Sequence, residues 1–181
     1  CGELCSKADT HQPQPPLAAA TDGPGPDVFV LASRVWNGHT FEHHPAVACL
    51  LADGLERALQ EPEIQDIARR MTFHYGNAVE LMRELAAQSR PDIVYLDPMY
   101  PERQKSAAVK KEMAYFHSVV GAAQEEAELL AAARAIAKKR VVVKRPRLGE
   151  FLNGEKPAYQ YTGKSTRFDV YLPDYPVKDG E

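Results

Sequence analysis

The stretch "PDIVYLDPMYP", residues 91–101, joins a buried strand to a charged and aromatic end. The run from Ile93 to Leu96 is apolar on both faces, which is typical of a central strand in a parallel sheet. The run ends on the carboxylate of Asp97, and Tyr100 follows between two prolines. Ligands of parallel α/β sheets bind at the carboxyl ends of the strands. The stretch therefore predicts a carboxylate and a ring at a cleft, although an Asp-Pro turn explains the tetrapeptide equally well.

Strands and helices alternate on both sides of this stretch. Helical spacing of apolar residues covers four segments, Val47–Ala58, Leu81–Leu85, Val109–Val120 and about Glu125–Lys138. Strand patterns cover 71–76 and 140–146, and "AYQYTG" and "TRFDVYL" predict a hairpin that turns at Lys164 and Ser165. This order predicts an α/β fold with a mostly parallel sheet and an antiparallel C-terminal hairpin at one edge.

The length of 181 residues suits one domain with its own core. Residues 1–18 are rich in proline and show no periodicity, so we expect an irregular segment there. Because the chain begins at Cys1 and not at a methionine, this segment is expected to be the remnant of a longer N-terminal region. The domain is expected to cover residues 19–175 and to be followed by a tail at 176–181.

Composition excludes several classes of protein. The sequence contains no run of eighteen apolar residues, so it predicts no transmembrane helix. We also find no signal-peptide pattern at the start of the given sequence. Three cysteines, Cys1, Cys5 and Cys49, form neither a disulfide framework nor a zinc motif, which favours a reduced cytoplasmic setting without a metal. The net charge of −3 argues against indiscriminate binding of nucleic acid. Basic residues nevertheless gather between Arg103 and Arg147, which leaves open an RNA or another phosphate-rich partner.

The motif Asp97-Pro98-Met99-Tyr100 resembles the Asp/Asn-Pro-Pro-aromatic signature of S-adenosylmethionine-dependent methyltransferases that act on exocyclic or amide nitrogens. Wider segments resemble the RsmJ family, bacterial methyltransferases of guanine N2 in small-subunit ribosomal RNA. These segments are "FVLAS", "HPAVACLLADGL", "VYLDPMYPERQKSAAVKKEM", "KKRVVVKRP" and "TGKSTRFDVYL", in order from about residue 20 to 172. The resemblance implies a Rossmann-like methyltransferase fold that binds S-adenosyl-L-methionine over the switch point of the sheet.

The resemblance also implies a cofactor site. The Gly-rich turn of the family matches "AATDGPGPD", residues 19–27, in which Ala19 and Pro26 replace an Asp and an Arg of the family pattern. Glu42 matches the acidic residue that binds the ribose hydroxyls, and Asn77 lies where the family contacts adenine, although capping of a helix explains an Asn as well. His74 is expected to form a wall of the pocket. The implied cofactor-binding residues are Gly23, Gly25, Pro26, Asp27, Glu42, His43, Gly76, Asn77 and Asp97.

The chemistry implied by the resemblance is methyl transfer to an amine. Asp97 and the carbonyl of Pro98 are expected to hold the N–H bonds of the amino group, so that its lone pair points at the methyl group. Tyr100 is expected to stack on the base. Contacts with RNA phosphates are expected from Lys105, Lys110, Lys111, Lys144 and Arg145. No metal is required, because the sulfonium is itself the electrophile.

The sequence therefore predicts a cytoplasmic methyltransferase that modifies guanine N2 in small-subunit (16S) ribosomal RNA, either as naked RNA or as a subunit particle. Two other functions remain open: a methyltransferase of the same fold acting on another amine in tRNA, DNA or protein, and a catalytically silent RNA-binding domain. A nicotinamide dehydrogenase is less compatible, because "GPGPDV" lacks the G-x-G-x-x-G spacing. The sequence leaves the modified guanine and the oligomeric state undetermined.

Overall fold

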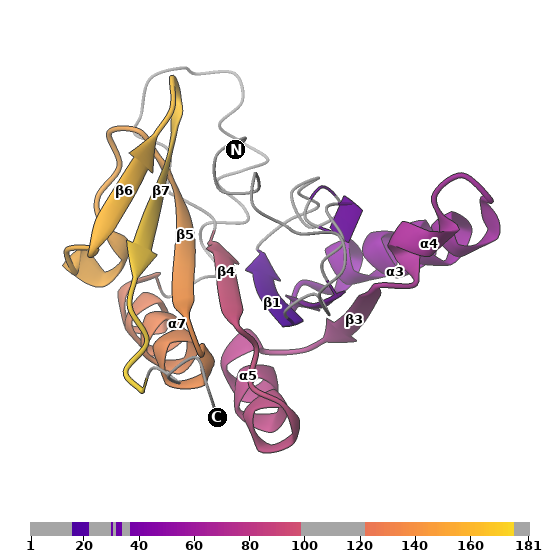
Figure 1. The fold of residues 1–181 in the computed structure, drawn as a ribbon, viewed down its shortest axis with the longest axis horizontal. Helices are drawn as coiled ribbons and strands as arrows, with labels where there is room; N and C mark the ends of the chain where they lie inside the picture. Colours follow the sequence, from indigo (N-terminus) through magenta and orange to yellow (C-terminus); the bar gives the residue numbers. More distant parts are fainter. Residues whose placement is uncertain (1–15, 22–29, 31, 34–36, 99–121, 176–181) are drawn as a thin grey trace.

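A computed structural model describes residues 16–21, 30, 32–33, 37–98 and 122–175 of the chain. Its strands form one seven-stranded sheet with the order β3-β2-β1-β4-β5-β7-β6 (Figure 1). The strands are β1 (Pro16–Thr21), β2 (Asn37–Glu42), β3 (Met71–Tyr75), β4 (Ile93–Asp97), β5 (Arg140–Pro146), β6 (Tyr159–Thr162) and β7 (Thr166–Tyr171). The first five strands run parallel, whereas β7 runs antiparallel to both β5 and β6. The predicted fold class is therefore confirmed.

Helices cover the sheet on both faces. They are α3 (Pro45–Gln60), α4 (Gln65–Ala68), α5 (Ala78–Gln88), α7 (Ala122–Ile136) and the 3-10 helix η1 (Leu152–Gly154). Pro45 stands in the first turn of α3, where its missing N–H costs nothing. Helices α5 and α7 pack against each other, whereas α3 lies beside β2 and β3 (Figure 1). Within the described ranges, no helix is long and apolar enough to span a membrane.

The core confirms that β4 is apolar on both faces. Val94 and Leu96 belong to the larger cluster, together with Met82 of α5 and Leu130 of α7. Tyr95 points to the opposite face, where it packs with residues of β1, β5 and β7. The alternation of side chains along a strand explains this division. The position of β4 in the middle of the sheet explains why its apolar run is continuous.

Strand β1 corrects the expectation for the N-terminal segment. It begins at Pro16, inside the residues expected to be irregular, and pairs with β2 on one side and β4 on the other. Its alanines are buried, with Ala18 at 0% and Ala19 at 1% exposure. Alanine has a weak intrinsic preference for strands, so the pairing in the sheet overrides the local signal. Pro16 is tolerated because it is the first residue of the strand.

The other described elements that had an expected segment agree with it to within a few residues, whereas no segment was delimited for β2, α4 or η1. Helix α7 begins three residues earlier than the expected start at Glu125, and β3 and β5 match their expected ranges closely. The expected hairpin is present as β6 and β7. The helix expected at Val109–Val120 lies outside the described residues.

Candidate functional site

The strand registers align five residues at the carboxyl ends of the parallel strands. Tyr75 pairs with Glu42, and Thr21 pairs with Asp97. Extending the registers of β1–β2 and β4–β5 by one residue places Thr21 opposite Glu42, and Asp97 opposite Lys144. Two acidic residues therefore end strands that are two spacings apart, roughly 10 Å in the plane of the sheet.

The first of these carboxylates, Glu42, is buried with 2% of the residue exposed. Its Oε1 accepts a hydrogen bond of 2.7 Å from the backbone N–H of His44. His44 is the N-cap residue of α3, so the carboxylate lies at the positive end of a helix. A buried carboxylate is stable only when donors surround it. This environment is compatible with the ribose-binding role that the resemblance implies, and that role stays a prediction.

The turn from β3 into α5 lies against Glu42. The backbone N–H of Gly76 donates to the Glu42 carbonyl over 3.0 Å. Gly76 adopts a φ of 150°, and a Cβ there would lie 3.3 Å from Cδ1 of Leu81. The positive φ favours glycine, and any Cβ would also make the Leu81 side chain shift slightly. The turn therefore brings the backbone close to the strand end where the cofactor site is expected.

Asn77 caps helix α5. Its Oδ1 accepts hydrogen bonds from the backbone N–H groups of Val79 at 2.9 Å and Glu80 at 3.3 Å. This confirms the capping role that we weighed against a contact with adenine. The cap fixes the side chain at the start of α5, and the contact with adenine stays a prediction.

The second carboxylate, Asp97, forms an ion pair across two strands. Nζ of Lys144 lies 3.0 Å from Oδ2 of Asp97, and their side chains are 30% and 26% exposed. Pro98, the next residue, is buried. Lys144 was predicted to contact RNA phosphates, yet it lies beside the residue predicted to orient the target amine. The pairing of β4 with β5 brings Lys144 and Asp97 together. The spacing of residues within one strand does not predict this contact.

Arg145 requires a correction. It was predicted to contact RNA phosphates, but it is 1% exposed, and its Nη2 lies 3.1 Å from Oε1 of Glu126 on α7. Successive residues of a strand point to opposite faces, so Lys144 and Arg145 cannot serve the same surface. Because the guanidinium lies between the sheet and α7, it has a structural role in the core and not a contact with phosphates.

Sequence reasoning missed a pair of histidines on β2 and β3. Nδ1 of His39 lies 2.9 Å from Nε2 of His74, and the rings stack with centroids 5.2 Å apart. Burial lowers the pKa of His39 below its usual 6.5, and the proximity of His74 lowers it further. The expected role of His74 as a wall of the pocket stays a prediction. In the register of β2 and β3, His39 lies opposite Thr72 and His74 lies opposite Phe41, so the two histidines meet diagonally on one face of the sheet. This contact can be found only once the register is known.

The remaining predicted residues fall into two groups. His43 is exposed and lies 3.8 Å from Glu42, and its contact with the cofactor stays a prediction. The others lie outside the described residues: Gly23, Gly25, Pro26, Asp27, Tyr100, Lys105, Lys110 and Lys111. In the part of the chain that the structure describes, no cluster of three or more His, Cys, Asp or Glu side chains is arranged to hold a metal.

Comparisons with known proteins agree with this arrangement. The family model described as putative SAM-dependent methyltransferase matches residues 3–173. Ribosomal RNA small subunit methyltransferase J of Neisseria gonorrhoeae is 66% identical over 173 residues, which are 95% of this chain and 69% of that protein. The protein of the same name from Thioalkalivibrio sulfidiphilus is 50% identical over 159 residues, 88% of this chain and 62% of the relative.

A solved structure supports the same relationship. The crystal structure of a SAM-dependent methyltransferase from Neisseria gonorrhoeae superposes with a TM-score of 0.78 at 58% identity, covering 99% of this chain and 70% of that one. S-adenosylmethionine is therefore the cofactor of this enzyme, as the sequence predicted. The chain belongs to the SAM-dependent methyltransferase family that includes ribosomal RNA small subunit methyltransferase J.

Proposed function

We propose that this enzyme transfers a methyl group from S-adenosylmethionine to the exocyclic N2 of a guanine in small-subunit ribosomal RNA, in the cytoplasm. The observation that supports it most is the ion pair of Asp97 and Lys144, which lies in one row with Glu42 at the carboxyl edge of the sheet. The relatives at 50–66% identity are named for small-subunit ribosomal RNA. The names of the relatives support the substrate class, and the row of residues supports this edge of the sheet as the place of methyl transfer.

Glu42 and the β3–α5 turn are suited to hold the cofactor. The buried Glu42 carboxylate would accept hydrogen bonds from the ribose hydroxyls, and the backbone at Gly76 would approach the adenine region closely. When bound, S-adenosylmethionine supplies a methyl group on a positively charged sulfur. The glycines and Asp27 of the segment 19–27 would complete the pocket, in line with the resemblance.

Asp97 is suited to position the target amine. The lone pair of the guanine amino group is delocalised into the ring, so it must be directed at the methyl carbon. A carboxylate that accepts an N–H bond directs it and stabilises the positive charge that grows on the nitrogen. Lys144 holds Oδ2 of Asp97, which orients the carboxylate. The Pro98 carbonyl would accept the second N–H, and the ring of Tyr100 would stack on the base.

The proposal is tested with small-subunit ribosomal RNA and subunit particles from cells that lack the gene. The protein is incubated with each substrate and S-adenosylmethionine carrying a labelled methyl group, and the digested nucleosides are identified by mass spectrometry. We expect label in N2-methylguanosine, and we expect Asp97→Asn to lower turnover by about a hundredfold.

The matched control is Asp92→Asn. Asp92 precedes the same strand and also faces lysines, with Lys139 Nζ at 3.3 Å, but it lies at the opposite end of β4. Turnover of Asp92→Asn should stay near that of the wild type once the folded fraction is taken into account. Label in another nucleoside, or in tRNA or protein alone, would assign a different amine to the same fold. Cofactor binding without any methyl transfer would indicate a silent RNA-binding domain.

A further inference from the structure

The C-terminal hairpin continues the row of residues that contains Asp97. Lys144 pairs with Phe168 of β7, and Phe168 pairs with Tyr161 of β6. Residues that face each other across antiparallel strands point to the same face of the sheet. Tyr161 therefore shares the face of Asp97 and Lys144, three strand spacings or roughly 14 Å away from Asp97.

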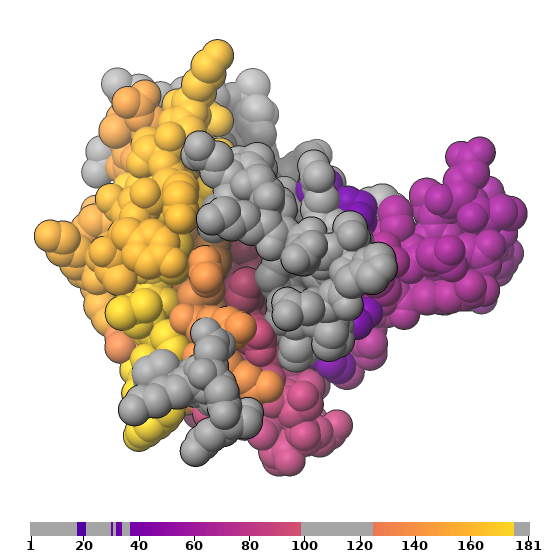
Figure 2. Space-filling model, viewed as in Figure 1, coloured from indigo at the N-terminus to yellow at the C-terminus, as the bar shows by residue number. Residues whose placement is uncertain are grey.

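Tyr159 and Tyr161 form an exposed aromatic surface on β6. Each is 39% exposed, and their rings meet edge to face with centroids 5.8 Å apart. β6 is the last strand in the sheet order, and all four of its residues are exposed. Figure 2 shows the hairpin, in yellow and orange, exposed along one side of the molecule. Two large rings on an edge strand are suited to a flat partner.

Two exposed cations lie at the tip of the hairpin, beyond Tyr161. Lys164 lies in the turn between β6 and β7, and Arg147 follows the end of β5; both are exposed. The backbone N–H of Arg147 donates to the Ser165 carbonyl over 2.9 Å, which ties the loop to the turn. β5 runs parallel to β4, so these cations lie at the edge of the sheet where Asp97 ends its strand. One exposed acidic residue, Glu150, lies further along this loop.

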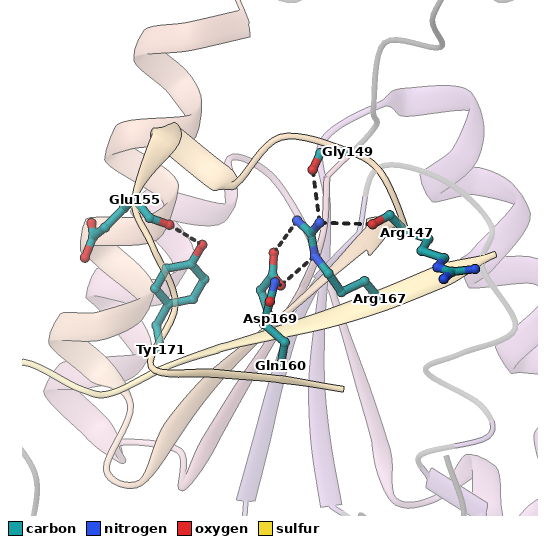
Figure 3. Close-up of polar contacts among 7 residues, drawn as sticks. All are labelled: Arg147, Gly149, Glu155, Gln160, Arg167, Asp169 and Tyr171. Atoms are coloured by element: carbon teal, nitrogen blue, oxygen red, sulfur yellow. Dashed lines mark hydrogen bonds and ion pairs between the residues drawn. The ribbon is translucent and has the colours of Figure 1, made fainter. Parts of the chain in front are cut away.

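A buried ion pair on the other face holds this surface in place (Figure 3). Arg167 donates to Asp169 from Nε at 2.7 Å and from Nη2 at 2.8 Å. Its Nη1 donates to the carbonyls of Arg147 at 3.2 Å and Gly149 at 3.1 Å. Nε2 of Gln160, between the two tyrosines, donates to Asp169 over 2.6 Å. The edge strand and the loop are thus fixed before any ligand binds, which lowers the entropy cost of binding.

We infer that Tyr159, Tyr161, Lys164 and Arg147 form a binding surface for single-stranded RNA, which we call the hairpin platform. This inference rests on the proposed function and names the part of the substrate that the surface binds. Bases stack on aromatic rings whatever their identity, and cations nearby neutralise the phosphates. The separation from Asp97 means that the platform holds nucleotides next to the target base and not the target itself. A duplex keeps its bases stacked inside, so unpaired RNA is the favoured form.

The rings are tested by the affinity of the protein for short single-stranded RNA, measured by fluorescence anisotropy. Tyr159→Val and Tyr161→Val keep a residue that favours strands and remove the ring. We expect each to weaken binding by about fivefold or more, and Tyr161→Phe to bind as the wild type does. The control is Tyr175→Val, because Tyr175 is 72% exposed and follows the end of β7 away from the hairpin tip. A duplex RNA of the same length should bind more weakly than the single strand.

The cations are tested by the salt dependence of the same affinity. Removing one phosphate contact should flatten the slope of log affinity against log salt by about 0.7 for a single strand. We expect this for Lys164→Ala and Arg147→Ala. The control is Arg83→Ala, because Arg83 is also exposed but lies on α5 and not on the hairpin. Thermal unfolding of each variant checks that the fold is intact.

The outcomes separate this inference from the proposed function. If wild-type protein methylates ribosomal RNA and the two tyrosine variants bind and methylate RNA equally well, the platform is overturned and the function stands. If the variants change self-association with unchanged RNA affinity, β6 serves a protein contact and the platform is again overturned. If wild-type protein yields no methylguanosine in any RNA, the proposed function fails whatever the hairpin binds.

Discussion

Nζ of Lys144 lies 3.0 Å from Oδ2 of Asp97, so an ion pair joins the last residue of β4 to β5 two residues before β5 ends. Both side chains remain partly exposed at the edge of the sheet. This geometry gives Lys144 two conceivable tasks, because it can orient Asp97 or contact a phosphate of the RNA. The two tasks differ in their kinetic signature.

The first prediction concerns Lys144→Met. If Lys144 orients Asp97, the variant should lower turnover by about tenfold or more, because the carboxylate loses its fixed position. The salt dependence of RNA affinity should stay unchanged. If Lys144 contacts a phosphate, affinity should fall and the salt slope should flatten by about 0.7–0.9 with little change in turnover. Single-turnover kinetics and anisotropy on the same preparations distinguish these results.

The second prediction concerns Glu42→Gln. The amide oxygen can still accept the hydrogen bond from the His44 N–H that Oε1 receives at 2.7 Å, so the start of α3 should survive. The lost charge should weaken binding of S-adenosylmethionine by about 1–3 kcal/mol, as expected for a hydrogen bond to a charged group. Isothermal calorimetry measures this directly. Unchanged cofactor affinity in a folded variant would remove Glu42 from the site.

How far the sequence predicts this fold depends on the residue. Strand β4 was predictable, because Val94, Tyr95 and Leu96 are buried on two faces and the sequence shows an unbroken apolar run. Strand β1 was not, because its buried positions between β2 and β4 are alanines and its only β-branched residue is Thr21, the last one. A strand whose burial comes from its neighbours gives little local signal.

The candidate site shows the same limit. The positions of Glu42 and Asp97 at the ends of strands were predictable, the first from the resemblance and the second from the motif, and their roles stay predictions. The pairing of Lys144 with Asp97 and of His39 with His74 depends on strand order, which the spacing of residues does not determine. The assignment of Arg145 to phosphate contacts was wrong because it relied on the clustering of basic residues in the sequence. Side chains alternate between the two faces of a strand, and Arg145 lies on the face that is buried against Glu126.

The third prediction concerns pH and His39. Its folded-state pKa is lowered, so the unfolded chain takes up a proton at His39 more readily than the folded chain. Stability should therefore fall as the pH drops below about 6.5, the value of an unperturbed histidine. Thermal midpoints at about pH 7.5 and about pH 5.5 measure the fall. His39→Gln should reduce this fall of the thermal midpoint, and His74→Gln should reduce the fall as well, because each variant removes one partner of the pair. A fall of equal size in all three proteins would assign the pH dependence to other groups.

The last prediction concerns the buried ion pair of Arg167 and Asp169. The side chains are 9% and 0% exposed, so removing one partner leaves the other charge buried and uncompensated. Arg167→Met should lower the free energy of unfolding in urea by about 3–5 kcal/mol, and the double variant with Asp169→Leu should lose less than the sum of the single changes. The matched control is Arg57→Met, which breaks a 2.8 Å pair with Asp53 whose side chains are 74% and 63% exposed. That variant should lose about 0–1 kcal/mol of the free energy of unfolding.

Because Arg167 also holds the carbonyls of Arg147 and Gly149, the folded fraction of Arg167→Met should bind single-stranded RNA less tightly than the wild type, whereas Arg57→Met should not. Equal RNA affinity in folded Arg167→Met would show that the loop keeps its position without this ion pair.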